Sequence, residues 1–262
     1  MFTQLLSLFF PRLCMVCGKS LIQAEKLICL GCVSDLPRSG YWLQEENVIT
    51  RLFGELPENV ATRLSTELPE GEDDLYIEQS SNFENVTNGE HTFHIEHASS
   101  FLYYSRESPY HQLVHHLKYY GESYIGFELG LWFGAELKQA PLYKTVEAIV
   151  PVPLHPRKER KRGYNQSLFF AQGIAQQTGW TLEGEAVKRI RRTASQALLK
   201  KEERQKNVAG AFSLFHPEHI AGKHILLVDD VLTTGATLQA CASELLKAPD
   251  CKVSVASIVH IE

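Results

Sequence analysis

Residues 225–237 read ILLVDDVLTTGAT, and this stretch decides the fold more than any other part of the chain. Its apolar start is typical of a buried strand, and the carboxylates of Asp229 and Asp230 follow at the end of that strand. The next residues are small or carry hydroxyl groups, and they lead into an alanine- and leucine-rich stretch at 235–247. We therefore expect a strand, a loop and a helix, with acidic groups where the strand ends.

The loop has the composition of a phosphate site. Its small residues can offer backbone N–H and hydroxyl groups to an anion at the start of a helix. They are Thr233, Thr234, Gly235, Ala236 and Thr237. The two carboxylates repel a phosphate, so they must serve hydroxyl groups or a metal on the same ligand. A ligand that joins a phosphate to a vicinal diol, such as a ribose 5-phosphate, fits both halves.

Two other interpretations of this segment are weaker. Asp229 and Asp230 could simply cap the following helix, but two acids followed by Thr-Thr-Gly-x-Thr exceed what capping requires. A P-loop nucleotide site needs the pattern G-x4-G-K-[ST]. The nearest candidate, GKS at 18–20, has Leu13 where the first glycine belongs. A sugar-phosphate site is therefore favoured.

Two Cys-x2-Cys pairs near the start of the chain predict a structural zinc site. The pairs are separated by eleven residues, and four thiolates are a ligand set that tetrahedral zinc accepts. The expected ligands are Cys14, Cys17, Cys29 and Cys32. Unrelated buried thiols are the alternative, and a redox pair is disfavoured because the expected βαβ context is missing. Four protein ligands leave no open position, so we expect a structural site.

Composition and charge further restrict the class of protein. Hydrophobic residues make up 44% of the 262 residues, as in an ordinary globular chain. No apolar run approaches the ~20 residues that span a membrane, and no secretory signal is recognisable, so the chain is interpreted as not secreted. Residues 1–150 hold 10 Lys and Arg against 20 Asp and Glu, whereas residues 151–262 hold 16 against 11. An anionic ligand is therefore expected in the second part.

Two basic segments are the candidates for that role. Residues 157–162 carry five cations in six positions, and a second basic stretch spans 188–206. Exposed basic turns, pyrophosphate binding and contact with a nucleic-acid backbone all stay open for them. The candidate pyrophosphate ligands are Arg160, Arg162 and Arg192.

The order of periodic segments indicates an α/β fold. Strands are expected at 99–104, 146–153, 186–190, 224–230 and 252–260, and helices at 107–120, 123–138, 163–178 and 235–247. Their alternation implies a mostly parallel sheet with helices on both faces. Residues 41–98 are polar and acidic and are interpreted as a linker with little core of its own. The expected parts are a zinc module at 1–40, this linker and a domain at 99–262.

The motifs together resemble the ComF family of competence-associated, phosphoribosyltransferase-like proteins. Beside the four cysteines, the resemblance rests on HLKY at 116–119, VPVPL at 150–154, RGYNQ at 162–166 and Arg204-x2-Asn207. The acidic loop resembles the 5-phosphoribosyl 1-pyrophosphate (PRPP) motif of type I phosphoribosyltransferases at all 13 positions of 225–237. One departure is an acidic insertion at roughly 57–96, whose charge disfavours DNA contact there.

The resemblance implies a type I phosphoribosyltransferase-like parallel sheet with a small N-terminal zinc ribbon. It implies PRPP and Mg²⁺ as ligands, phosphoribosyltransferase activity, and a role in DNA uptake during natural transformation. Single-stranded DNA and other competence proteins follow as candidate partners. A PRPP sensor or DNA-handling adaptor without turnover stays open, as does nucleobase salvage, although salvage needs no zinc module. The acceptor and the general base are not identified.

Overall fold

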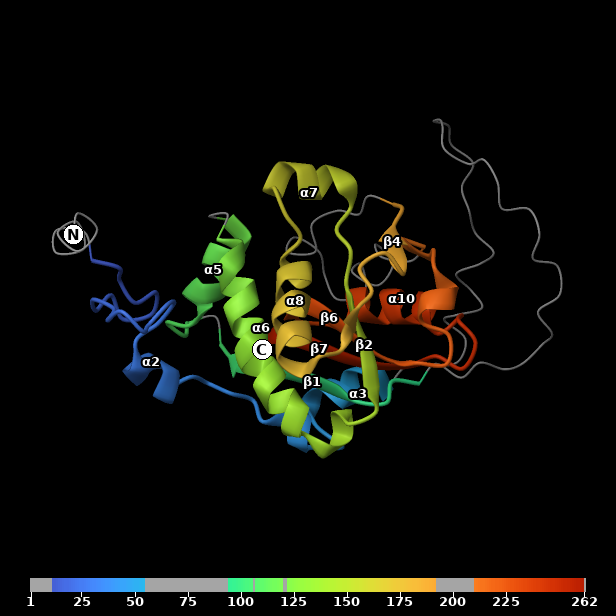
Figure 1. The fold of residues 1–262 in the computed structure, drawn as a ribbon, viewed down its shortest axis with the longest axis horizontal. Helices are drawn as coiled ribbons and strands as arrows, with labels where there is room; N and C mark the ends of the chain where they lie inside the picture. Colours follow the sequence, from blue (N-terminus) through green and yellow to red (C-terminus); the bar gives the residue numbers. More distant parts are fainter. Residues whose placement is uncertain (1–10, 55–93, 106, 120–121, 192–209, 262) are drawn as a thin grey trace.

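The computed structural model describes residues 11–54, 94–105, 107–119, 122–191 and 210–261 (Figure 1). Its centre is a five-stranded, all-parallel sheet with the order β1-β7-β6-β2-β3. The strands are β1 (Ala98–Tyr104), β2 (Val146–Pro151), β3 (Thr181–Leu182), β6 (His224–Leu232) and β7 (Lys252–Ile261). The predicted parallel sheet is confirmed, and its last strand in the sequence, β7, lies between β1 and β6.

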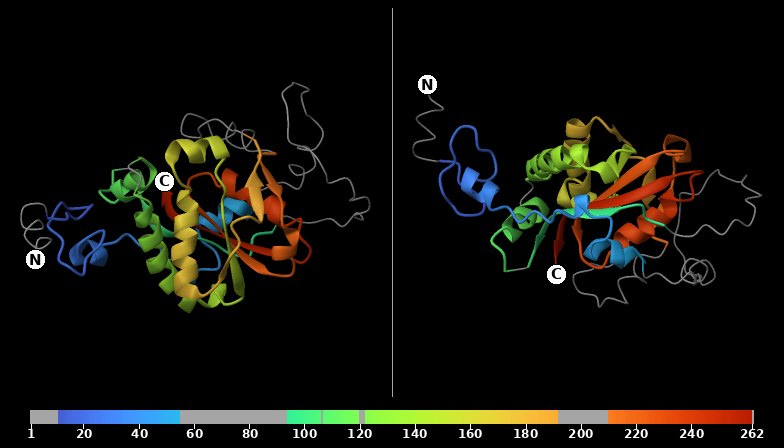
Figure 2. Two further views of the ribbon diagram at one scale, coloured as in Figure 1. Left: turned by 45° about the horizontal axis from the view of Figure 1, so that its top comes forward. Right: turned by 90° about the horizontal axis from the view of Figure 1, so that it is seen from below.

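Helices cover both faces of the sheet (Figure 2). One face carries α5 (His111–Tyr119), α6 (Ser123–Gln139) and α8 (Gln166–Thr178), and the other carries α3 (Val48–Gly54) and α10 (Ala236–Leu245). Strand β6 is apolar on both sides: Leu226 and Val228 join the core under α6 and α8, whereas Ile225 and Leu227 join the core under α10. A strand buried on both faces explains the continuous apolar run in the sequence.

The connections of β2 and β6 lead in opposite directions. The chain passes from β2 through α8 to β3, and from β6 through α10 to β7. Because such crossovers are right-handed, the two helices lie on opposite faces. The carboxyl ends of β2 and β6 are therefore the switch point of the sheet, the place where open α/β folds bind ligands.

Glycines allow α6 and α8 to pack with their backbones in contact. A Cβ atom on Gly130 would lie 2.3 Å from the carbonyl oxygen of Phe170, and one on Gly173 would lie 2.1 Å from that of Phe127. No side chain fits at either position. This close crossing fixes the start of α8 relative to the sheet.

A second, small sheet pairs β4 (Val187–Arg189) with β5 (Phe212–Leu214) in antiparallel orientation. The strand expected at 186–190 is confirmed, but sequence reasoning missed β5, because three residues are too few to show a period. The short 3₁₀ helix η4 (Pro217–His219) follows β5 and leads to β6.

The N-terminal residues are more integrated than expected. The cysteine module contains the bridge Leu13–Ser20 and the helix α2 (Leu30–Ser34). Beyond it, the 3₁₀ helix η1 (Tyr41–Leu43) buries Trp42 against Phe101 and Phe133. Residues 41–54 thus belong to the core, which differs from the expected linker. Residues 55–93 lie outside the described part, and the proposed division of the chain stays a prediction.

The first basic segment forms a helix rather than a loop. The helix is α7 (Pro156–Arg162), which begins after the His155 cap and ends at Gly163 in the left-handed conformation (φ 93°). It stands between the end of β2 and the start of α8, beside the switch point (Figure 1). Among the described residues, no helix has both the length and the apolar character needed to cross a membrane.

Candidate functional site

The open edge of β6 is created where β2 stops. Strand β2 pairs with β6 only as far as Val228, while β6 continues beside β7 to Leu232. The segment Pro151–Pro153 contains two prolines, which lack the N–H group needed to extend the ladder. Asp229 and Asp230 therefore lie within β6 but beyond its last partner on the β2 side. The sequence predicted both acids after the strand, and the structure places them on its unpaired final part.

Asp229 is held by two hydrogen bonds. Its Oδ1 accepts from Ser167 Oγ at 2.9 Å and from the backbone N–H of Asp230 at 2.8 Å. Burial, together with the neighbouring Asp230 carboxylate, raises the pKa of Asp229 to about 7 despite these bonds. Asp230 Oδ2 lies 3.3 Å from Lys118 Nζ at the end of α5. The two acids thus have different surroundings: one is fixed by donors, and the other faces a cation.

The loop after the acids leads into α10. Gly235 is the N-cap residue of this helix with φ 75°, and the acids contact Ser167, Lys118 and each other instead, so the capping interpretation of the acids is wrong. The buried Oγ1 of Thr234 has no hydrogen-bond partner among the described residues. The loop and the end of β6 line a small pocket with residues 229, 231–233 and 235–238. Thr234 does not line this pocket, so the loop groups that a ligand could reach there belong to the other residues of the loop.

Gly235 is favoured by its backbone conformation, because a side chain is strained at its positive φ. The Phe53 ring of α3 packs beside it, at an ordinary contact distance of 3.4 Å from where a Cβ atom would stand. Gln239 of α10 also donates to the carbonyl oxygen of Leu52 at 2.8 Å. Leu52 and Phe53, in the stretch expected to be a linker, therefore pack against α10 and the loop that precedes it.

The predicted pyrophosphate ligands are not brought to the loop. Arg160 is exposed on α7, and Arg162 is half-buried and donates to Gln166 Oε1 at 2.7 Å. Within the described part of the chain, neither side chain forms a hydrogen bond or an ion pair with residues 233–237. Arg192 lies outside the described residues. A pyrophosphate role for these three arginines stays a prediction.

Sequence reasoning missed three residues around the acids: Lys118, Ser167 and Arg189. Arg189 is buried on β4 above the Phe212 ring at 5.1 Å; burial lowers its pKa, while the charge of Asp229 raises it. A signal existed for two of them, since Lys118 lies within the HLKY motif and Ser167 directly follows RGYNQ. No pattern in the sequence marked Arg189.

The RGYNQ motif at 162–166 connects the elements that surround Asp229 and Asp230, and these elements together form the candidate crevice. Asn165 caps α8 by accepting from the N–H of Ser167 at 3.2 Å, and its Nδ2 donates to the carbonyl oxygen of Val152 at 3.1 Å. The Tyr164 hydroxyl donates to the carbonyl oxygen of Leu117. The motif thereby ties the ends of β2 and α5 to the start of α8.

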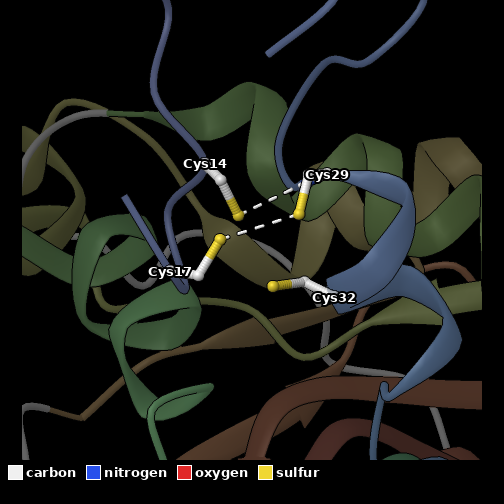
Figure 3. A group of neighbouring side chains, drawn as sticks. All are labelled: Cys14, Cys17, Cys29 and Cys32. Carbon is white, nitrogen blue, oxygen red and sulfur yellow. Dashed lines mark hydrogen bonds between the residues drawn. The ribbon is translucent and has the colours of Figure 1, made fainter. Parts of the chain in front are cut away.

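The four cysteines converge as zinc ligands do (Figure 3). Their sulfur atoms all lie within 4.8 Å of one another. Sγ of Cys17 and Sγ of Cys29 are 3.6 Å apart, close to the ~3.8 Å expected for two sulfurs in tetrahedral coordination at about 2.3 Å from zinc. The donor set and its spacing fit a structural zinc ion, held by Cys14, Cys17, Cys29 and Cys32.

The thiols also share negative charge unequally. Burial disfavours the thiolate of Cys14, but hydrogen bonds from the backbone at Cys17 and Cys29 outweigh it and lower the pKa of Cys14 to about 6. Burial, followed by the neighbouring thiols, raises the pKa of Cys32. Four thiolates this close repel one another, so a cation is needed to hold them together.

The cysteine module docks on the helices that lead to the crevice. The Tyr110 hydroxyl, just before α5, donates to the carbonyl oxygen of Cys32 at 2.9 Å. Lys26 Nζ lies 2.6 Å from Glu128 Oε1 on α6. The far end of α5 carries Lys118, which faces Asp230. One helix thus touches both candidate sites.

Comparisons with known proteins agree with this architecture. Residues 165–262 match the phosphoribosyl transferase domain. The chain is 34% identical over 142 residues to the DNA utilization protein YhgH of Salmonella typhimurium and 35% identical to that of Escherichia coli K12; each match covers 53% of this chain and 62% of the relative. Competence protein F of Haemophilus influenzae is 34% identical over 113 residues, 43% of this chain and 49% of that protein.

Solved structures with a local likeness include two phosphoribosyltransferase-type enzymes. The glutamine PRPP amidotransferase from B. subtilis, complexed with ADP and GMP, is 20% identical with a TM-score of 0.34 and covers 50% of this chain and 26% of that one. A hypoxanthine phosphoribosyltransferase from Staphylococcus aureus is 14% identical with a TM-score of 0.32, covering 53% and 64%.

The domain match and the parallel sheet define a phosphoribosyltransferase-like protein with an N-terminal cysteine module. Its relatives at ~34% identity, which include Competence protein F, agree with the resemblance to the ComF family that its motifs carry. The match spans 62% of the length of the first of these relatives.

Proposed function

We propose that this protein binds PRPP together with Mg²⁺ at the end of β6, as a phosphoribosyltransferase-type enzyme that acts in DNA uptake during natural transformation. The observation that carries the proposal is that Asp229, followed by Asp230 at the end of β6, lines one small pocket together with the loop that begins α10. A cytoplasmic location and contacts with other competence proteins belong to the same proposal.

The phosphate loop would hold the 5-phosphate. The first turn of α10 has backbone N–H groups that no side chain caps, and such groups bind anions together with the helix dipole. Thr233 and Thr237 line the same pocket and would contact the phosphate. Gly235 would let the phosphate approach the backbone closely.

The acids would hold the ribose hydroxyl groups. Asp229 is oriented by Ser167, so one of its oxygens stays available for the diol. Carboxylate oxygens are also the donors that Mg²⁺ prefers, so Asp229 and Asp230 fit that ion directly or through water. When bound, Mg²⁺ would supply positive charge to the departing pyrophosphate. Lys118 neutralises Asp230 in the structure described, and a ligand on Asp230 would leave this cation facing the phosphates.

Removing both acids tests the binding proposal. We expect Asp229→Asn combined with Asp230→Asn to weaken PRPP binding roughly 10- to 100-fold, since a hydrogen bond to a charged group contributes about 1.5–3 kcal/mol. Titration calorimetry with PRPP and Mg²⁺ measures this. Asp250→Asn is the matched control, because Asp250 precedes β7 at the opposite end of the sheet. Unchanged affinity in the double variant would contradict the diol role.

Turnover is a separate question from binding. Pyrophosphate release from PRPP, measured across nucleobases, amines and single-stranded DNA, tests for an acceptor. Release with any acceptor, lost in the Asp229/Asp230 double variant, supports an enzyme. Binding without release supports a PRPP sensor or adaptor instead.

A DNA-handling role has its own support. Helix α7 exposes Arg157, Arg160 and Lys161 beside the carboxyl ends of the strands (Figure 1). Exposed cations in a row attract a nucleic-acid backbone without reading its sequence. Both the proposed enzyme and a non-catalytic adaptor could use this surface. It therefore supports a role in DNA handling and does not distinguish catalysis from binding alone.

A further inference from the structure

A second group of metal-ligating side chains lies away from both candidate sites. It consists of His216, Glu218 and His219, on the segment that leads from β5 through η4 toward β6. One donor atom from each side chain lies within 4.8 Å of the others. All three side chains are partly exposed, with 41%, 63% and 47% of their surface accessible, so an ion can reach them.

The distances within the group fit coordination of one ion. His216 Nδ1 and Glu218 Oε1 form a hydrogen bond at 3.0 Å, and His219 Nε2 is 3.9 Å from the same oxygen. Two ligand atoms about 2.0–2.1 Å from a tetrahedral zinc are separated by ~3.3 Å, and the two measured distances lie on either side of this value. The longer one exceeds a hydrogen bond. The imidazole rings stack at 5.0 Å with an angle of 17° between their planes.

A carboxylate from another strand orients His219. Glu183, directly after β3, has its Oε2 3.2 Å from His219 Nδ1, on the opposite side of the ring from Nε2. This ion pair places the carboxylate of Glu183 beside Nδ1, while Nε2 lies on the side of Glu218. Metal-bound histidines usually have such a carboxylate partner. Lys223 Nζ, 3.7 Å from Glu183 Oε1, balances the charge of Glu183, so Glu218 gives the group its net negative charge.

We propose that His216, Glu218 and His219 bind a divalent transition metal ion, represented by Zn²⁺, with Glu183 as the positioning residue and the fourth coordination position open. Imidazole with one carboxylate suits zinc and its neighbours among the transition metals rather than Mg²⁺ or Ca²⁺. The ion would connect the segment after β5 to the end of β3, and so the small sheet to the large one. This site is independent of the proposed PRPP crevice.

Metal binding to the full chain tests the site. Titration calorimetry with Zn²⁺ is expected to give two equivalents for the intact chain and one for the variant His216→Ala with His219→Ala. The matched control is His111→Ala with His115→Ala, a pair of neighbouring exposed histidines on α5, which should keep both equivalents. Glu183→Gln should retain the site but weaken it about 10- to 100-fold, the usual effect of losing such a partner.

Cobalt substitution distinguishes the two metal sites. Co²⁺ bound by thiolates shows sulfur-to-metal charge-transfer absorption, whereas Co²⁺ bound by His and Glu does not, so the cysteine site is followed separately. The second equivalent should also raise the melting temperature of the intact chain but not of the His216/His219 variant. Equal stoichiometry in these two proteins, with both folded by circular dichroism, would overturn the proposal, whether or not the cysteine site holds zinc.

Discussion

The cysteine site and the phosphate crevice are assembled in opposite ways. All four cysteines lie within residues 14–32, and their sulfurs converge without help from the sheet. The crevice takes Lys118 from α5, Ser167 from α8 and Asp229–Asp230 from β6. The first site is set within one short segment, and the second is set by the packing of distant elements. We therefore expect different substitutions to disrupt the two sites.

The cysteine module should show the largest effect. We expect Cys14→Ser with Cys29→Ser to abolish zinc binding and unfold the module, because structural zinc contributes about 10–16 kcal/mol of apparent binding energy in isolated fingers. Metal analysis by mass spectrometry measures the loss, and Cys251→Ser is the control outside the module. PRPP affinity should stay within roughly twofold if the sites are independent. Full zinc occupancy in the double variant would refute the assignment.

The second perturbation acts on the fold that builds the crevice. Gly130→Ala should destabilise the protein by about 1–3 kcal/mol, since overpacking forces the α6 and α8 backbones apart. Urea unfolding measures the change. Gly184→Ala is the matched control, because a Cβ atom there meets nothing within 4 Å. Equal stability of the two variants would show that the helices can separate at no cost.

Lys118, which pairs with Asp230, allows one contact of the crevice to be tested by itself. Lys118→Met should weaken PRPP binding by about tenfold, because a charge-assisted contact to the ligand is lost, at roughly 1.5 kcal/mol or more. Lys247→Met removes another paired lysine, 2.7 Å from Glu244 on α10, and serves as the control. If calorimetry gives both variants the affinity of the intact chain, Lys118 only balances the charge of Asp230.

The smallest effect is expected on α7. Replacing Arg160, Lys161 and Arg162 by Ala should flatten the dependence of single-stranded DNA affinity on salt, by about 0.7 in the log–log slope for each lost phosphate contact. Filter binding at several salt concentrations measures the slope. Replacing the exposed Lys138, Lys144 and Lys252 removes equal charge at the other end of the sheet as a control. No DNA binding by the intact chain at low salt would exclude this role.

The sequence by itself determined the features that depend only on residues close together in the chain. The spacing of the cysteines predicted their convergence, because short turns place both thiols of a pair on one side. The apolar run before Asp229 predicted a strand buried on both faces. The loop 233–237 predicted a phosphate site, because its backbone freedom and hydroxyl groups are local properties. These features need no knowledge of distant partners.

Only the tertiary structure decided what depends on contacts between distant segments. It placed Lys118, rather than Arg160 or Arg162, against Asp230. It also made residues 41–54 part of the core, because Trp42 finds Phe101 and Phe133 far along the chain. Such partners are set by how the strands and helices pack, and packing depends on the shape of the whole core rather than on the order of residues within any one segment.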